Sequence, residues 1–314
     1  MKISVIVPCY NEEGNVEKFL EETKKAMCGY TDSFEIVFVN DGSRDSTPAV
    51  LRRLFEENRD VKIKVINFSR NFGKEAAVYA GFTEAKGEYV TVIDADLQQD
   101  PAYAVQLGRI LDENPDCDIV AAFQQQRKEG AFISFCKTMF YKAINKVSDV
   151  ELIADASDFR TVRRSVADTI LALPEYHRFS KGIFSWVGYN TVAMPYNVKQ
   201  RQSGESKWSF IKLVKYALDG VTAYTDLPLR LPAYTGAVML ILSVIMLSGF
   251  AAADAFFPDF NAAYGYLASL VLFVGAIICA FIGVLGYYTG KIHIQVKQRP
   301  IFIAKEILAY DDKD

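Results

Sequence analysis

The chain lacks the cysteine pattern of a disulfide framework or a zinc site. It has five cysteines among 314 residues, an odd number, and no two of them form a C-x-x-C pair. This spacing argues against structural zinc and disulfides, and it is typical of a reducing compartment. The N-terminal sequence also lacks a signal-peptide cleavage site, because its short apolar run is followed at once by Asn and two Glu residues. We therefore expect a first strand there and no signal peptide.

Charge is nearly absent from residues 231–290, which contain no Lys or Arg and only two acidic side chains, Asp254 and Asp259. The uncharged stretches 232–253 and 260–290 are each long enough to cross a bilayer, which takes about 20 apolar residues. Basic residues flank the outer ends of this segment and are missing from its central turn. The positive-inside rule then predicts a two-helix transmembrane hairpin with both termini in the cytoplasm. The alternative is a helical hairpin buried in a soluble core.

Charge is also divided unevenly along the rest of the chain. Residues 1–119 carry 14 basic and 22 acidic side chains, whereas residues 120–230 carry 16 basic and 10 acidic ones, in a chain whose formal net charge is −3. A globally acidic protein is a poor candidate for bulk nucleic-acid binding. The basic middle segment suits an anionic membrane surface or a phosphate, and the alternative is an ordinary solvated charged face.

Short, β-branched apolar runs predict the strands of the N-terminal domain. They are residues 3–7, 36–39, 63–66, 90–93 and 119–122. Polar helical patterns separate the first four runs, and strands alternating with helices predict an α/β fold with a parallel sheet covered on both faces. Ligands of such sheets bind beyond the carboxyl ends of the strands. The polar loops after the first four runs are therefore the expected site.

Glycine-rich phosphate loops are missing: neither G-x-G-x-x-G nor G-x-x-x-x-G-K-[ST] occurs, which argues against a dinucleotide enzyme or a P-loop NTPase. The two histidines, His177 and His293, lack metal-ligand spacing and are assigned to structure or surface. A D-x-D pair, Asp94 and Asp96, does follow the fourth apolar run directly. Two carboxylates at a strand end offer hard oxygen ligands to Mg²⁺ or Mn²⁺. The alternative for this pair is a purely structural loop or helix cap.

Five motifs follow one another along the chain, and the two uncharged stretches come after them. The motifs are VIVPCYNEEGNV, VNDGSRDST, FSRNFGKEAAVYAGFTEAKG, VIDADLQQDP and RQSGESKW. In this order they resemble glycosyltransferase family 2, in the branch that acts on polyisoprenyl phosphates. That branch includes dolichol-phosphate mannosyltransferases and bacterial undecaprenyl-phosphate glucosyltransferases, and the hairpin is most similar to the bacterial members. The resemblance covers essentially the whole chain and implies a GT-A, Rossmann-like nucleotide-diphospho-sugar transferase domain.

The resemblance also implies which residues bind the sugar-nucleotide donor. Those implied at the nucleotide are Pro8, Tyr10, Glu12, Asp41, Arg70, Lys74 and Asp94. Those implied at the diphosphate, in a mobile loop, are Arg201, Ser206 and Lys207. A divalent cation, Mg²⁺ or Mn²⁺, is implied at Asp96 and Gln98, with Asp94 beside it, and Asp96 is thereby a catalytic residue. A cation with Arg and Lys would stabilise the negative charge of a leaving diphosphate.

The acceptor side is expected to lie near the membrane. Apolar residues at helical spacing, with lysines beside them, occur in residues 132–147 and 210–221. Such stripes are usually core faces, but the second leads into a predicted span, so interfacial amphipathic helices are the preferred interpretation. The resemblance implies that Arg127, and less closely Lys137, takes the lipid phosphate. It also implies that Asp158 is the general base, although a largely dianionic phosphate needs little deprotonation, so orienting the acceptor is the alternative role.

The resemblance implies inverting transfer of one sugar from a nucleoside-diphosphate donor to undecaprenyl phosphate, for cell-surface glycan modification. UDP-glucose or another UDP-hexose is the preferred donor, and GDP-mannose and UDP-N-acetylglucosamine stay open. A processive polysaccharide synthase is a more remote alternative, because such enzymes usually have a Q-x-x-R-W motif and more spans. A non-catalytic membrane subunit that binds sugar nucleotides is another, and the intact set of Asp94, Asp96, Arg201 and Lys207 argues against it.

The expected domain order follows from these assignments. It is a cytoplasmic catalytic domain at 1–208, an amphipathic interfacial helix at 209–230, two transmembrane helices at 231–290 and a cytoplasmic tail at 291–314. We expect an enzyme of the inner (plasma) membrane. Small residues in the second span, including Gly275, Ala276, Ala280 and Gly283, allow close helix approach. They suit either a homo-oligomer or the pair of helices within one chain.

Overall fold

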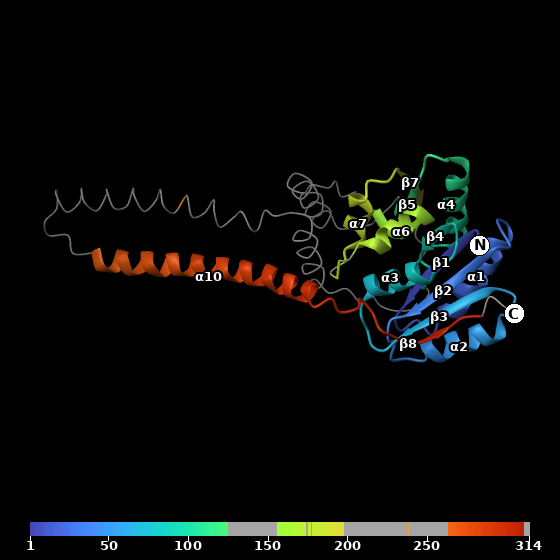
Figure 1. Ribbon diagram of the computed structural model, residues 1–314, viewed down its shortest axis with the longest axis horizontal. Helices are drawn as coiled ribbons and strands as arrows, with labels where there is room; N and C mark the ends of the chain where they lie inside the picture. Colours follow the sequence, from blue (N-terminus) through green and yellow to red (C-terminus); the bar gives the residue numbers. More distant parts are fainter. Residues whose placement is uncertain (125–155, 174, 177, 198–237, 239–262, 311–314) are drawn as a thin grey trace. The chain divides into compact units, whose positions relative to one another are not determined.

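The structure is a computed structural model, and it describes residues 1–124, 156–173, 175–176, 178–197, 238 and 263–310 (Figure 1). The chain divides into two units. The first consists of Met1–Gly220 together with Pro300–Asp314, and the second is Val221–Arg299. The two flanks of the second unit therefore belong to the same domain.

Strands and helices alternate along the first unit. In chain order they are β1 (Ile3–Cys9), α1 (Val16–Cys28), β2 (Phe34–Asn40), α2 (Thr47–Glu57), β3 (Lys62–Phe68), α3 (Lys74–Glu84), β4 (Tyr89–Val92), α4 (Pro101–Glu113), β5 (Ile119–Gln124), β6 (Ala156–Arg163), α6 (Arg164–Ala172), α7 (Ser180–Trp186), β7 (Thr191–Tyr196) and β8 (Ala304–Leu308). The alternation matches the predicted α/β class, and strands were predicted within each of β1 to β5.

Within the described residues the strands form one eight-stranded sheet in the order β7-β5-β6-β4-β1-β2-β3-β8. Its centre is parallel, since β1 pairs in parallel with both β2 and β4, and β2 with β3. β6 is antiparallel to both β4 and β5, and β8 runs antiparallel to β3. Parallel neighbours require a crossover connection, which α1, α2 and α3 provide.

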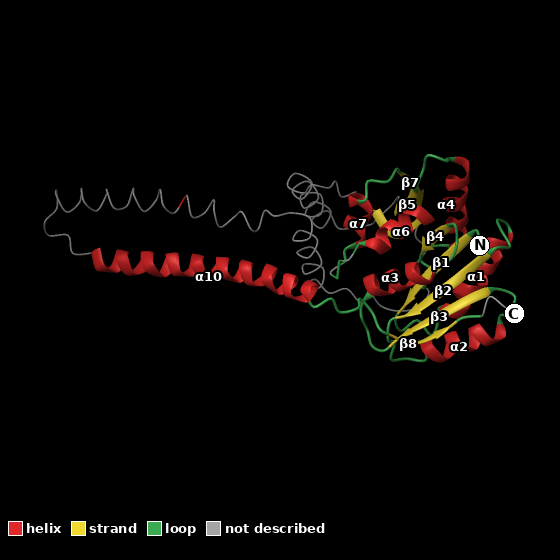
Figure 2. Ribbon diagram, viewed as in Figure 1, coloured by secondary structure: helices red, strands yellow, loops and turns green. Residues whose placement is uncertain are grey.

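Helices cover the sheet on both faces (Figure 2). Side chains of α1, α2 and α4 pack on one face, and those of α3, α6 and α7 pack on the other. Along β1, Val5 and Val7 join the first cluster while Ile6 between them joins the second. A strand buried on both sides is mostly apolar, which explains the short apolar runs in the sequence, although the buried Ser4, Lys64 and Thr91 occur within them.

Three strands were not predicted from the sequence. β6 reads ASDFRTVR, in which charged and polar residues interrupt the apolar pattern. β7 contains Pro195 and exposes several of its side chains, and β8 has only five residues with alternating exposure. β7 and β8 are the two edge strands of the sheet, where fewer neighbours bury them and the apolar signal is therefore weaker. β6 lies inside the sheet, and it was missed because the buried residues Arg160 and Thr161 break its apolar pattern.

The second unit contributes one long helix to the described residues, α10 (Ala263–Val296), with 34 residues. It overlaps the second predicted span, while nearly all of the first predicted span lies outside the described residues. The two amphipathic segments, 132–147 and 210–221, also lie outside them. Among the helices in the part of the chain that the structure describes, none combines the length and hydropathy needed to cross a membrane.

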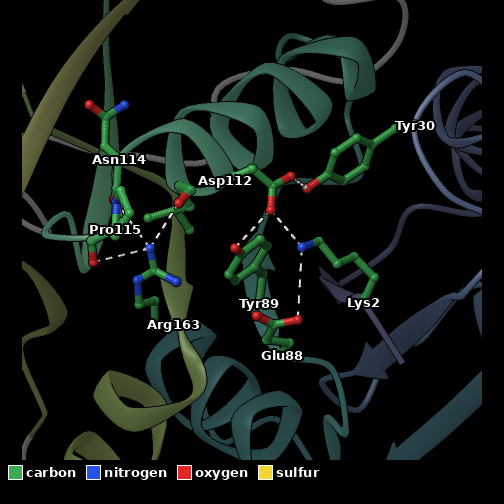
Figure 3. A network of polar contacts seen from close by, with 9 residues as sticks. Lys2, Tyr30, Glu88, Tyr89, Asp112, Asn114, Pro115 and Arg163 are labelled. Carbon is green, nitrogen blue, oxygen red and sulfur yellow. Dashed lines mark hydrogen bonds and ion pairs between the residues drawn. The ribbon is translucent and has the colours of Figure 1, made fainter.

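A polar network at the amino ends of β1 and β4 joins the sheet to α4 (Figure 3). The Asp112 carboxylate accepts hydrogen bonds from the hydroxyls of Tyr30 (2.8 Å) and Tyr89 (2.9 Å), and it pairs with the Lys2 ammonium. The Arg163 guanidinium donates to the carbonyl oxygens of Leu111, near the end of the same helix, and of Cys117, just before β5. The network therefore fastens the end of the sheet opposite the polar strand-end loops.

We expect Asp112→Ala to lower the free energy of unfolding by about 1 to 2 kcal/mol, because two tyrosine hydroxyls and a lysine lose their shared acceptor. Asp116→Ala is the matched control, since this nearby aspartate is exposed. Urea titrations followed by circular dichroism measure both variants. Equal effects of the two substitutions would contradict a structural role for the network.

Candidate active site

The polar strand-end loops meet at one edge of the sheet, as predicted. The register aligns Cys9 of β1 with Asn40 of β2, and Asn40 with Asn67 of β3. The three strands therefore end side by side, and the chain leaves each of them on the same edge. β4 joins this edge, because the Ile93 amide that follows it still donates to the carbonyl oxygen of Ile6 (3.0 Å). The loops that follow the first four predicted strands therefore lie at one edge of the sheet.

Asp41 connects the loop after β2 to the loop after β3. Its carboxylate is almost fully buried and accepts hydrogen bonds from the backbone amides of Phe72 (2.6 Å) and Gly73 (3.0 Å). Burial raises the pKa of Asp41, and these amide bonds and Arg70 partly offset the rise. Gly42 follows with φ +63°, and a Cβ at this position would overlap the backbone of Arg70. The glycine is required by this close approach as well as by its conformation.

The first loop is tied to the second in the same way. Asn11 adopts a left-handed conformation (φ 56°), donates its amide to Ser43 Oγ (2.9 Å) and accepts from the amide of Arg44 (2.9 Å). The Glu12 carboxylate accepts from the side chain of Asn15 (2.7 Å), the residue directly before α1. Pro8, near the end of β1, and Tyr10, directly after it, are both partly exposed. The predicted nucleotide residues at the ends of the first three strands thus lie along one edge of the sheet, which we call the rim.

Lys74 joins two carboxylates that are distant in sequence. Its ammonium lies 2.7 Å from Asp94 Oδ1 and 3.1 Å from Asp158 Oδ2. Lys74 begins α3, Asp94 follows β4, and Asp158 comes from β6, which pairs with β4. Lys74 and Asp94 were expected at the donor, and Asp158 at the acceptor. The structure brings Lys74 into direct contact with both carboxylates.

The charges of this cluster are mutually stabilised. Burial alone would raise the pKa of Asp158, but the positive charges of Lys74, Lys181 and Arg160 outweigh it and lower that pKa to about 2. Burial would likewise lower the pKa of Lys74, and the two carboxylates reverse this and raise it. Lys74 and Asp158 are therefore both charged at neutral pH. Oδ1 of Asp158 is buried and has no hydrogen-bond partner within the described residues.

The D-x-D pair lies in a tight turn after β4. Asp96 Oδ1 accepts from the amide of Gln98 (3.1 Å), and Leu97 between them has a left-handed backbone (φ 58°). Gln99 Oε1 accepts the amide of Asp94 (3.2 Å) and thereby anchors the turn. Two carboxylates and the Gln98 amide oxygen are oxygen donors of the kind that Mg²⁺ and Mn²⁺ prefer. No group of three or more His, Cys, Asp or Glu side chains with metal-site geometry occurs in the described part of the chain.

Glu75 belongs to the candidate site and was not predicted from the sequence. It follows Lys74 on α3 and lines the same small cavity as Lys74, Asp158 and Ser180. Its carboxylate accepts hydrogen bonds from the Ser180 amide (3.2 Å) and hydroxyl, at the start of α7. Burial and the neighbouring charge of Asp158 raise the pKa of Glu75, and the bonds from Ser180 partly offset this. The sequence points to Glu75 only through its position directly after Lys74, because its partner Ser180 lies in none of the five motifs.

Several predicted site residues lie outside the described residues. They are Arg127 and Lys137, predicted for the acceptor phosphate, and Arg201, Ser206 and Lys207, predicted for the diphosphate. Arg70 is described and exposed, with its guanidinium 4.1 Å from the centre of the Phe72 ring. Its predicted role at the nucleotide stays a prediction, as do those of Pro8, Tyr10 and Glu12.

Comparison with known proteins identifies relatives across the whole chain. The family model described as glycosyl transferase family 2 matches residues 4–171. CsbB of Bacillus subtilis (strain 168), named only provisionally as a glycosyltransferase, is 39% identical over 307 residues, which cover 97% of this chain and 91% of that protein. The bactoprenol glucosyl transferase of Shigella phage SfX is 36% identical over 309 residues, which cover 97% and 99%. The similarity therefore continues beyond the family model into the C-terminal segment.

A solved structure shares the fold. Mannosyl-3-phosphoglycerate synthase from Rubrobacter xylanophilus superposes with a TM-score of 0.50 and 17% identity, over 71% of this chain and 72% of its own. At this low identity the likeness concerns the fold alone. The first unit thus has the GT-A-like α/β fold that was expected.

We expect Lys74→Met to lower the free energy of unfolding at pH 7 by about 1 kcal/mol, because two carboxylates lose the cation between them at a partly exposed position. Asp158 has a lowered pKa, so the stability from this pair is present above about pH 4, the ordinary Asp range, and is lost as the pH falls toward 2. The deficit of the variant should therefore shrink at pH 3.

Urea titrations of the full chain in detergent at pH 7 and pH 3 measure this difference. Lys62→Met is the matched control, because Lys62 is exposed at the start of the neighbouring β3. An unchanged deficit at pH 3 would contradict the ion pair as its source.

Proposed function

The chain belongs to glycosyl transferase family 2, and from this membership we propose that it transfers a single sugar from a nucleoside-diphosphate donor to undecaprenyl phosphate. The observation that carries the proposal is the similarity over 97% of this chain to a protein named bactoprenol glucosyl transferase. That similarity spans the catalytic domain and the C-terminal segment together. A UDP-hexose, with UDP-glucose first, is the proposed donor.

The donor is proposed to bind at the carboxyl ends of β1 to β4. The rim formed by Tyr10, Glu12 and Asp41 would face the nucleotide, and Arg70 would frame it. Asp94, Asp96 and Gln98 would hold Mg²⁺ or Mn²⁺ through oxygen atoms. When bound, the cation supplies Lewis-acid stabilisation of charge on the leaving diphosphate. The loop with Arg201, Ser206 and Lys207 would add positive charge to the same group.

The acceptor is proposed to approach from the side of Asp158, with Arg127 and Lys137 near its phosphate. A phosphate oxygen forms a bond to the anomeric carbon while the bond from that carbon to the diphosphate oxygen breaks, and the diphosphate leaves with the electron pair. Attack from the opposite face inverts the configuration and gives a β-linked product from an α-linked donor. Because the phosphate is largely dianionic at neutral pH, no proton has to be removed.

This arrangement favours an orienting role for Asp158. A carboxyl group whose pKa is lowered to about 2 has too little proton affinity for an efficient general base near neutral pH. Its charge instead holds Lys74 beside Asp94, at 2.7 Å. Asp158 is therefore proposed to position Lys74 and the acceptor.

We propose that residues 231–290 anchor the enzyme in the inner membrane as a hairpin of two spans. Support comes from the lack of basic residues in this segment and from apolar side chains exposed along α10, such as Leu267, Val271 and Ile282. The pairing of β8 with β3 supports an even number of crossings, because both flanks of the segment contribute to one sheet and must lie on the same side. That side is proposed to be the cytoplasm.

We expect purified full-length enzyme with MnCl₂ or MgCl₂, undecaprenyl phosphate and a panel of sugar nucleotides to produce one glycolipid, detected by mass spectrometry. The panel contains UDP-glucose, UDP-galactose, UDP-N-acetylglucosamine and GDP-mannose, so it also decides among the alternative donors. Asp96→Ala should reduce turnover at least about 100-fold, because the cation that offsets the leaving charge is lost. Absence of glycolipid with every donor would refute the proposed reaction, and a product with several sugars would favour a processive synthase.

We expect Asp158→Asn to lower kcat without removing the acidic limb of the pH profile between pH 5.5 and 9. The reason is that this limb then follows the second ionisation of the acceptor phosphate, near pH 6. Asp168→Asn, on the exposed face of α6, serves as the control. A rate for Asp158→Asn that rises steadily with hydroxide concentration, unlike that of the native enzyme, would restore the general-base role.

A further inference from the structure

The chain returns to the catalytic domain after α10 and completes its sheet. β8 pairs antiparallel with β3, matching Glu306 with Asn67 and Ala304 with Phe68. The pairing continues past the end of β3, because the Ser69 amide donates to the carbonyl oxygen of Ile303 (2.9 Å). The C-terminal strand therefore reaches the loop that carries the predicted donor residues Arg70 and Lys74.

An aromatic contact links the segment just before β8 to the loop after β3. The Phe302 ring stacks on Phe68 with 5.0 Å between the ring centres, and Phe68 meets Phe72 edge to face at 5.7 Å. The amide of Phe72 is in turn held by the Asp41 carboxylate at 2.6 Å. Phe302 thus lies two contacts away from the bond that joins the second and third loops.

A chain of hydrogen bonds links the same strand to the first two loops. Asn67 Nδ2 donates to Glu306 Oε2 (3.2 Å), and Asn40 Nδ2 donates to Asn67 Oδ1 (2.8 Å). The Ser43 amide donates to Asn40 Oδ1 (3.1 Å), and Ser43 Oγ accepts from the amide of Asn11 (2.9 Å). Asn40 and Asn67 are both buried. This series of hydrogen bonds runs from β8 through β3 and β2 to the loop after β1.

The strand is also fixed on its outer side, away from these loops. Glu306 pairs with Arg52 of α2 through its other carboxylate oxygen. Farther along, the Tyr310 ring stacks on Phe55 of α2 at 4.4 Å, and its hydroxyl donates to the carbonyl oxygen of Phe55. These contacts attach the C-terminal tail to the domain but do not involve the three loops. Variants that remove them therefore test the effect of weaker tail attachment alone.

We propose that Phe302 and Glu306 are positioning residues that set the conformation of the three donor-binding loops, so that donor affinity depends on the segment after α10. The role assigned to these loops rests on the proposed function. Seven residues, 297–303, separate the end of α10 from the start of β8. The same short segment therefore connects the proposed membrane anchor to the donor loops.

The first test measures the loops without any substrate. Hydrogen–deuterium exchange of the full chain in detergent follows peptides that contain the amides of Ser43, Phe72 and Gly73. Phe302→Ala should speed exchange at Phe72 and Gly73, and Glu306→Ala should speed it at Ser43. Tyr310→Ala and Arg52→Ala are the controls, because each removes an outer contact of the tail and leaves the loop contacts in place. Both controls should leave these amides as protected as in the native chain.

The second test measures binding of UDP with MnCl₂ by titration calorimetry. Phe302→Ala and Glu306→Ala should each weaken binding about fivefold, the effect of one lost aromatic pair or charged hydrogen bond, while the controls stay within about twofold. In turnover the same variants should raise the donor KM and leave the acceptor KM unchanged. Phe302→Leu keeps most of the buried volume, so its affinity for UDP should lie between those of Phe302→Ala and the native chain. Such a graded loss shows that the weaker binding does not come from unfolding.

The outcomes separate the two proposals. Native exchange rates in the loop peptides of both variants, or equal acceleration by the Tyr310 and Arg52 controls, would overturn the positioning role whatever the reaction is. A native enzyme that makes no glycolipid would instead refute the proposed function, and the exchange experiment would still decide the role of Phe302 and Glu306.

Discussion

The contact between the Lys74 ammonium and two carboxylates is the interaction on which the candidate site depends. Asp158 lies in β6 and Asp94 comes just after β4, which pairs with β6, so their charges are held close together and would repel each other. Lys74 is placed between them because α3 begins at this residue, directly after the loop that Asp41 holds. The Lys74 ammonium therefore connects the expected donor side to the expected acceptor side. Any movement of the third loop would disturb both.

Backbone amides, rather than side-chain ion pairs, hold the loops themselves. Asp41 accepts from two successive amides of the third loop, and Asn40 and Ser43 serve the second and first loops in the same manner. Such bonds fix the path of the chain and leave the charged side chains of the rim, such as Arg70, exposed. Arg70 can therefore face a phosphorylated ligand directly, whereas the Lys74 ammonium is already paired with Asp94 and Asp158.

The sequence predicted the parts of the fold that follow from local pattern. β1 to β5 are short apolar runs, and the loops that follow them carry Asp41, Lys74 and Asp94, so one rule about strand ends located them. The contact of Asp158 with Lys74 could not be predicted in this way, because it depends on the pairing of β6 beside β4, and β6 has no continuous apolar run. The contact between Glu75 and Ser180 could not be predicted either, because the two residues are 105 positions apart and Ser180 lies in no motif.

The pairing of β3 with β8 has a consequence for how the chain folds. The hydrogen bond between Asn67 and Glu306 joins positions that are 239 residues apart. During synthesis the outer edge of β3 therefore stays open while the whole of the intervening chain is made, and an open edge is a template for pairing with other strands. Contacts over such separations also form slowly, because a large loop must close first. The domain is thus expected to reach its final form only after α10 has been made.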